Sequence, residues 1–326
     1  MSEPVRFGVL STARIARLVI AGARLAEGVE IAAVASRERA RAKAYASEHG
    51  IARVHGSYED MLADPDIDAV YIPLPNALHV PWSLRALEAG KHVLCEKPLS
   101  RRPEQVEEAF DAADRAGRLL MEAFMWRYHP QTDALVRCVR EGAIGQLRLI
   151  RAGFGFDIGA SPANVRWSGE LEGGALMDVG CYCVSAMRLL CGEPLRVSGE
   201  AVAGGHDVDA RFTGALRLEG DVVGLFDCGM DVAPRGFIEL VGDRGALRSS
   251  DPWHGRKPEV VLEPADGPPE PVATERVDPY ARELEDFASA VRDGGRPRLG
   301  RADALGQARA IAALYRSAAE GRAVAP

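Results

Sequence analysis

The first half of the chain alternates short apolar segments with longer segments of helical periodicity. The apolar segments are typical of strands buried on both faces, and the stretches between them repeat apolar residues every three to four positions. Such an alternation predicts a doubly wound parallel sheet of the α/β class. The expected strands cover residues 5–10, 30–36, 54–56, 69–72 and 93–95.

The pattern changes beyond residue 130, where apolar and polar residues alternate along several segments with no helix between most of them. Alternation with a period of two indicates strands with one buried face, and such strands predict an open, mostly antiparallel sheet with one face on helices. A helical tail over residues 278–316, broken at 294–297, should pack back on the body of the protein. The expected strands cover residues 146–152, 195–203, 211–218, 222–228 and 237–241.

A chain of 326 residues is longer than a usual single core, so two domains are expected. The change of pattern predicts a doubly wound α/β domain over residues 1–124 and an α+β domain over residues 125–326.

The composition of this chain restricts the classes of partner that it is expected to bind. The formal net charge of -7 and the isoelectric point near 5.6 argue against nucleic acid or an anionic membrane as the main partner. No apolar run approaches the roughly 18 residues of a membrane span, and the first residues lack the basic and apolar regions of a signal peptide. The six cysteines are scattered without the spacing of a zinc site, so we expect reduced thiols, no bound metal and a cytoplasmic protein.

The apolar strand that ends at Cys95 is followed by Glu96, Lys97 and Pro98. Proline cannot donate a hydrogen bond to a strand ladder, so Pro98 ends the strand and fixes a turn. Residues just beyond the carboxyl end of a strand in an open parallel sheet face the ligand crevice. The Lys97 ammonium is therefore a candidate for contact with the substrate, and a solvated surface lysine is the alternative.

The turn after the first strand occupies the place of a dinucleotide pyrophosphate, at the amino end of a helix. The three glycine positions of the usual G-x-G-x-x-G motif hold Ser11, Ala13 and Ala16. Small side chains still allow the backbone to approach a phosphate, and the hydroxyl of Ser11 or Thr12 adds a donor. An ordinary tight turn between strand and helix is the alternative.

The end of the second expected strand distinguishes NADP from NAD. An NAD enzyme usually carries Asp or Glu about 20 residues after the turn, where it binds the ribose hydroxyls. This chain has Ser36 and Arg37 there, and a guanidinium binds a 2′-phosphate in bidentate fashion. The pattern favours NADP, while Glu38 leaves NAD as a second option and Arg37 as a solvated charge is the alternative.

A glycine pair, Gly173 and Gly174, precedes an apolar periodic run that predicts a largely buried helix. Asp178 and Tyr182 are four residues apart in this run, so they share one face of the expected helix. A buried aspartate needs a partner or a function, and a structural Asp–Tyr pair is the alternative to a functional pair.

Taken together, the segments Gly8 to Ala16, Ser36-Arg37, Pro75-Asn76-x-x-His79 and Glu96-Lys97-Pro98 resemble the motifs of the Gfo/Idh/MocA family of nicotinamide-dependent oxidoreductases. The segment over residues 122–130 is similar to the branch of dimeric dihydrodiol dehydrogenases and NADP-dependent D-xylose 1-dehydrogenases. That branch also carries tyrosine where inositol dehydrogenases have histidine, at the position of Tyr182. The resemblance covers residues 5–316.

The resemblance implies roles for individual residues. Lys97 would be the catalytic lysine with Asp178 and Tyr182 beside it in function, and Pro98 would be a cis-proline. Substrate contacts are expected from Trp126, Phe156, Arg166 and Trp167, with core packing as the alternative for each tryptophan. The residues expected to bind the cofactor are Ser11, Thr12, Ala13, Arg14, Ile15, Ser36, Arg37, Pro73, Leu74, Asn76, His79, Glu96, Lys97 and Arg127.

The resemblance implies that residues 1–124 form the dinucleotide-binding Rossmann domain and that residues 125–326 bind the substrate and form oligomers. The implied activity is hydride transfer between NADP and a sugar or cyclic polyol. A phenol with its ordinary pKa of about 10 is a poor base, and a nearby cation lowers that pKa. We therefore expect Tyr182 to exchange the proton while Lys97 stabilises the phenolate. The alternatives are a keto-sugar or inosose reductase and a non-catalytic dinucleotide-binding sensor; the open sheet predicts a homodimer or homotetramer.

Overall fold

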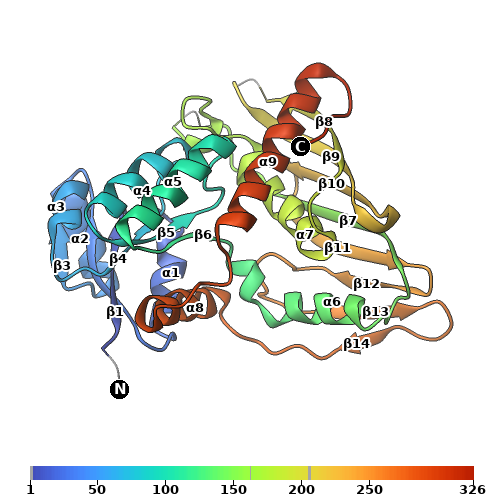
Figure 1. The fold of residues 1–326 in the computed structure, drawn as a ribbon, viewed down its shortest axis with the longest axis horizontal. Coiled ribbons are helices and arrows are strands. Elements are labelled where there is room, and N and C mark those ends of the chain that lie inside the picture. Colours follow the sequence, from blue (N-terminus) through green and yellow to red (C-terminus); the bar gives the residue numbers. More distant parts are fainter. Residues whose placement is uncertain (1–2, 162, 205–206) are drawn as a thin grey trace. The chain divides into compact units, whose positions relative to one another are not determined.

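The computed structural model describes residues 3–161, 163–204 and 207–326, which form two compact units (Figure 1). Unit 1 contains the chain up to Met125 together with Asp278–Leu305, and unit 2 contains Trp126–Val277 and Gly306–Pro326. Each unit is therefore built from segments that are distant in the sequence.

Unit 1 holds a six-stranded sheet in the order β3-β2-β1-β4-β5-β6, with every pair of neighbours parallel. This order confirms the predicted doubly wound sheet, and it reverses between β1 and β4, where such folds bind ligands. The strands are β1 (Val5–Leu10), β2 (Val29–Ala35), β3 (Arg53–His55), β4 (Ala69–Ile72), β5 (His92–Glu96) and β6 (Leu120–Ala123). The helices of unit 1 are α1 (Ala16–Ala23), α2 (Arg39–His49), α3 (Tyr58–Ala63), α4 (His79–Glu88), α5 (Pro103–Ala116) and α8 (Pro279–Asp293).

The two faces of β1 pack against different helices, because successive side chains of a strand point to opposite faces. The ring of Phe7 lies 5.9 Å from that of Phe287 in α8, whereas a side chain on Gly8 would collide with Met61 in α3. Gly22 of α1 lets the two helices approach closely, since a Cβ there would lie 2.8 Å from the Cβ of Tyr280 in α8. The segment that carries α8 is thus part of the core of unit 1.

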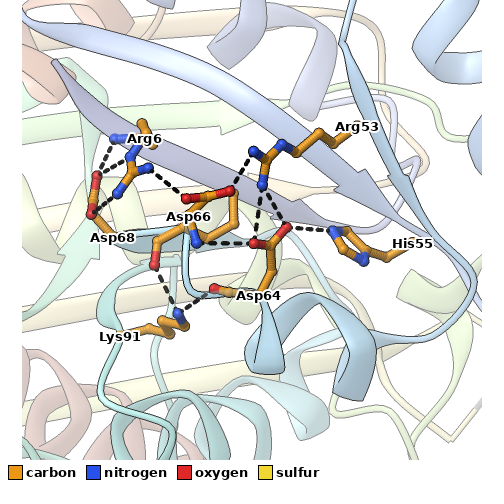
Figure 2. Close-up of polar contacts among 8 residues, drawn as sticks. Arg6, Arg53, His55, Asp64, Asp66, Asp68 and Lys91 are labelled. Atoms are coloured by element: carbon orange, nitrogen blue, oxygen red, sulfur yellow. Dashed lines mark hydrogen bonds and ion pairs between the residues drawn. The ribbon is translucent and has the colours of Figure 1, made fainter.

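A polar network ties the amino ends of β1, β3 and β5 together (Figure 2). Arg6 donates to Asp68 at 2.9 Å, and Arg53 donates to Asp64 at 3.1 Å. The buried Lys91 donates to the backbone carbonyls of Asp64 at 2.6 Å and Ile67 at 2.8 Å. Burial raises the pKa of Asp68, but the hydrogen bonds from Arg6 outweigh it and leave that pKa lowered. These contacts give the amino ends of the strands a structural role. The candidate functional residues follow the carboxyl ends of the strands, on the opposite side of the sheet.

Unit 2 holds an eight-stranded sheet in the order β14-β13-β12-β11-β7-β10-β9-β8. Neighbours are antiparallel except β7 and β10, which confirms the prediction of a mostly antiparallel sheet. The strands are β7 (Leu147–Gly155), β8 (Arg196–Ala203), β9 (Asp209–Arg217), β10 (Val223–Gly229), β11 (Arg235–Gly242), β12 (Gly245–Ser249), β13 (Val260–Pro264) and β14 (Glu270–Val272).

One face of this sheet is covered by helices, and the other is open. Helix α7 (Cys181–Cys191) packs on β7 and β10, α6 (Pro130–Arg140) on β13, and α9 (Arg301–Glu320) meets β9 through the ring contact of Tyr315 with Phe212. On the open face Leu225 keeps 41% of its surface exposed. It helps to line a shallow depression of about 380 Å³ with Arg151 and Thr213. None of the helices in the described residues is both long enough and apolar enough to cross a membrane.

Candidate active site

The turn that follows β1 keeps the backbone shape of a glycine motif without the glycine. Ser11 has a φ of 147°, in the region that glycine favours. Its hydroxyl donates to the carbonyl of Pro73 at 3.3 Å and accepts from the backbone N–H of Ala13 at 3.2 Å. These two hydrogen bonds offset the backbone strain and link the turn after β1 to the loop after β4.

The amino end of α1 supplies the donors that a pyrophosphate needs. The helix has no side-chain cap and no acidic residue in its first turn. Within the described part of the chain, no group accepts a hydrogen bond from the backbone N–H of Thr12, Arg14 or Ile15. These donors and the positive end of the helix fit a dinucleotide phosphate.

Cations gather beyond the carboxyl end of β2. Ser36 is buried and its hydroxyl accepts from the N–H of Glu38 at 3.3 Å, whereas Arg37 is exposed. Burial raises the pKa of Tyr58, and the positive charges of Arg37 and Arg41 partly oppose that shift. The two guanidinium groups therefore act on the same hydroxyl. The sequence analysis did not select Arg41, although it belongs to the basic stretch that follows Arg37.

The loops after β4 and β5 are joined by the buried ring of His79. Its Nδ1 lies 2.8 Å from the carbonyl oxygen of Pro98, and its Nε2 lies 2.8 Å from that of Leu74. Burial and the charge of Lys97 lower the pKa of His79 to about 4. Asn76 begins the 3₁₀ turn Asn76–Leu78 that leads into α4. Both ring nitrogens of His79 thus face backbone carbonyls.

Lys97 lies just beyond β5, as predicted. The Lys97–Pro98 peptide bond is cis, which confirms the expectation drawn from the family resemblance. Glu96 accepts from the hydroxyl of Tyr71 at 2.6 Å and from the backbone N–H of Lys97 at 3.3 Å. Burial raises the pKa of Tyr71 well above its usual value, so this phenol remains a donor.

In unit 2, Asp178 lies in a π-helical turn, Leu176–Gly180, that leads directly into α7. The sequence pattern predicted one regular helix here, so the four-residue spacing from Asp178 to Tyr182 spans a change of helix type. Asp178 accepts from Arg166 at 2.8 Å, an ion pair in which the aspartate side chain is 13% exposed. Turns of this kind are frequent at functional sites.

The ring of Tyr182 lies in an aromatic cluster on β7 and the segment after β12. It meets Phe154 edge-on at 5.3 Å and Trp253 at 5.9 Å. Two predicted substrate residues join the same cluster, since Phe156 lies 5.8 Å from Phe154 and Trp126 lies 5.5 Å from Trp253. Sequence analysis missed Phe154 and Trp253. The alternation of β7 could have indicated Phe154, whereas Trp253 stands in an irregular segment without a pattern.

Two further predicted residues of unit 2 are buried by other contacts. Arg127 donates to the hydroxyl of Ser185 at 3.2 Å and lies over the ring of Trp126. The indole N–H of Trp167 donates to the carbonyl of Gly159 at 2.7 Å. Their burial gives both side chains a packing role within unit 2. The other predicted residues fall into groups: Ser11, Pro73, Leu74, His79, Glu96 and Lys97 are linked within unit 1, and Arg166 with Asp178 within unit 2.

Comparison with known proteins identifies related chains along nearly the whole length. Residues 5–124 match the model of an oxidoreductase family with an NAD-binding Rossmann fold, and residues 132–248 match a GFO/IDH/MocA C-terminal domain. A D-xylose 1-dehydrogenase (NADP⁺) of Haloferax volcanii is 39% identical, with 98% of each chain covered. A dTDP-3,4-didehydro-2,6-dideoxy-α-D-glucose 3-reductase of Actinomadura kijaniata is 36% identical, over 96% of this chain and 95% of the reductase.

A solved structure of a 3-ketoreductase from Actinomadura kijaniata, with NADP and TDP-benzene, superposes with a TM-score of 0.91 at 33% identity. The superposition covers 97% of this chain and 98% of the ketoreductase chain. Aldose-aldose oxidoreductase from Caulobacter crescentus superposes with a TM-score of 0.92 at 28% identity, over 99% and 100% of the two chains. The sequence matches and both sheets agree, and this chain belongs to the GFO/IDH/MocA family of nicotinamide-dependent oxidoreductases.

Proposed function

We propose that this protein is an NADP-dependent oxidoreductase that transfers a hydride between the nicotinamide and a carbon of a sugar or cyclic polyol. The observation that carries the proposal is the position of Lys97, which directly follows β5 at the same carboxyl end of the parallel strands as the Ser11 turn. Related proteins support it, because they are an NADP-dependent xylose dehydrogenase and a reductase of a dTDP-linked keto-sugar.

The cofactor would be held by groups of unit 1. Backbone N–H groups of Thr12, Arg14 and Ile15 would bind the pyrophosphate, while Arg37 and Arg41 would bind the 2′-phosphate. Bound NADP supplies the hydride acceptor, or the donor in the reverse direction. The protein's own residues then have to manage only the proton and the charge on the substrate oxygen.

We assign the transfer of the substrate's hydroxyl proton to Tyr182 and the stabilisation of the charge on the substrate oxygen to Lys97. Removing a proton from the carbinol oxygen makes hydride loss from the adjacent carbon easier, and a cation stabilises the developing alkoxide. Tyr182 takes the proton in oxidation and returns it in reduction, while Lys97 favours the phenolate form. Asp178, through its ion pair with Arg166, orients the polar groups around the substrate hydroxyl.

Reduction of a keto-sugar is the second candidate, favoured by the dTDP-linked sugar reductase among the relatives. The same residues would serve, because Tyr182 as a phenol is the general acid of the reverse reaction. A dinucleotide sensor would not need Lys97, Asp178 and Tyr182 together, so their joint presence argues against that reading.

The test of the cofactor assignment is turnover with NADP and with NAD on a panel of aldoses, inositols and diols, followed by absorbance. Replacing Arg37 by alanine should raise the KM for NADP about 10- to 100-fold and leave the KM for NAD nearly unchanged. The loss corresponds to one or two charge-assisted hydrogen bonds of about 1.5–3 kcal/mol each. Lys43→Ala, an equal change of charge on the exposed side of α2, is the control. Equal use of both cofactors by the wild type would contradict the role of Arg37.

We also propose that the open face of the eight-stranded sheet joins copies of this chain into a homodimer or homotetramer. The exposed Leu225 and the depression beside it, which has both apolar and charged residues in its lining, support this as a surface that a second copy could fill. Leu225→Arg should shift the mass measured by light scattering to that of one chain, with Val202→Arg at the far edge strand as control. A monomeric wild type would refute the proposal.

We also infer a cytoplasmic location, which the six free cysteines support because disulfides are rare in that compartment.

A further inference from the structure

We propose that three buried side chains, Tyr71, His79 and Glu122, form a clamp that holds the turn carrying Lys97 in its working position. The turn consists of residues 96–99, and the clamp residues come from β4, α4 and β6. The inference rests on the proposed function, because it takes Lys97 as the catalytic lysine. The three side chains are positioning residues, and we expect none of them to touch the substrate.

The clamp reaches the turn on both sides of Lys97. Before it, the hydroxyl of Tyr71 donates to Glu96 at 2.6 Å. After it, the ring of His79 lies 2.8 Å from the carbonyl oxygen of Pro98, and Glu122 accepts from the backbone N–H of Leu99 at 2.8 Å. Each contact comes from a different element of unit 1, so β4, α4 and β6 together fix the position of the turn.

The chain needs such a clamp because the sheet ladder cannot hold this turn. Pro98 has no N–H to donate, and β5 ends at Glu96. The carbonyl of Pro98 and the N–H of Leu99 are nevertheless buried, and an unpaired buried polar group costs about 1–3 kcal/mol. Glu122 satisfies the N–H of Leu99, and the neutral ring of His79 satisfies the carbonyl of Pro98 in the tautomer that carries its proton on Nδ1. A histidine and a glutamate in the core are themselves costly, which is a reason to assign them a positioning role.

His79 adds a second link. Its Nε2 lies 2.8 Å from the carbonyl of Leu74, in the loop that also accepts the hydroxyl of Ser11 at Pro73. The same imidazole therefore lies in contact with the Lys97 turn and with the loop that borders the phosphate-binding turn, and as a neutral ring it donates to one of the two carbonyls at a time. Sequence analysis predicted His79 as a cofactor-binding residue, and we infer that it acts by setting the distance between these two loops. Misplacing a catalytic group by about 1 Å can cost about a hundredfold in rate.

The test compares His79→Gln with His92→Gln. His92 is a matched control because it lies at the other end of β5, where its Nδ1 accepts from the N–H of Leu119 at 3.0 Å. Burial lowers the pKa of His92 to about 4 as well, so both rings are neutral near pH 7 and both substitutions remove a neutral imidazole. Three quantities are measured for each variant: amide hydrogen exchange of Leu99 in the cofactor-free protein, the Kd for NADPH, and kcat.

We expect His79→Gln to speed exchange of the Leu99 amide at least tenfold and to lower kcat about 10- to 100-fold, with the Kd changed less than threefold. His92→Gln should leave the Leu99 amide and kcat within twofold of the wild type. Tyr71→Phe removes only one hydroxyl and serves as the second variant if His79→Gln does not fold; it should lower kcat about tenfold.

Unchanged exchange at Leu99 and an unchanged kcat in His79→Gln, or the same losses in His92→Gln, would overturn the clamp. If the wild-type protein oxidises and reduces none of the sugars or polyols, the proposed function fails. Exchange at Leu99 then still decides, on the cofactor-free protein, whether His79 holds the turn.

Discussion

Replacing Lys97 by methionine is expected to lower kcat about a thousandfold while NADPH still binds with a nearly unchanged Kd. Methionine keeps the length of the side chain and removes its charge, so the loss reports on stabilisation of the alkoxide and the phenolate. Removal of one such electrostatic group costs about 10²–10³ in rate, and loss of the assisted proton transfer adds to it. Steady-state kinetics and fluorescence titration of NADPH measure the two quantities separately.

Lys91→Met is the matched control, since Lys91 lies just before β5 and Lys97 just after it. Its ammonium donates to two backbone carbonyls of the network in Figure 2, at the structural edge of the sheet. That variant should unfold at a lower temperature but keep the kcat of the wild type. A Lys97→Met protein with more than a tenth of the wild-type kcat would remove Lys97 from the mechanism.

Tyr182→Phe is expected to lower kcat about 10²- to 10⁴-fold, the usual contribution of a positioned acid or base. The phenyl ring keeps the edge-on contacts with Phe154 and Trp253, so the fold and the substrate KM should change little. The pH profile of kcat/KM should also lose the limb that reports ionisation of the base.

Tyr315→Phe is the control for Tyr182→Phe, because the hydroxyl of Tyr315 donates to Asp209 at 2.9 Å, in a structural pair. It should alter stability and leave kcat unchanged. Near-wild-type turnover of Tyr182→Phe, with its pH profile intact, would assign the proton to Lys97 instead.

The fold was predictable because its strands carry two distinct periodicities. Continuous apolar segments such as β4 predicted a parallel sheet with both faces covered, and the alternation along β7 predicted a half-open one. The strands β6 and β12 to β14 were not predicted. They are short and weakly alternating, and β14 contains Pro271.

The site was predictable where a reactive residue type stands at a recognisable place in the fold, as Lys97 does just after a strand that proline ends. It was less predictable where the site depends on backbone conformation. Nothing in the sequence of residues 176–180 distinguishes a π-helical turn from a regular helix, and the tight space at Gly180, where a Cβ would lie 2.7 Å from the Sγ of Cys228, appears only in the structure. The φ of Ser11 is likewise invisible in the sequence, since serine rarely adopts it.

The division of unit 1 into two segments has a consequence for the newly made chain. Phe7 and Gly22 pack against Phe287 and Tyr280, which are synthesised after the whole eight-stranded sheet. The early segment therefore leaves the ribosome with Phe7 and the Gly22 surface of α1 uncovered. Translation completes the core of unit 1 only when α8 emerges, so until then these apolar residues are available to chaperones.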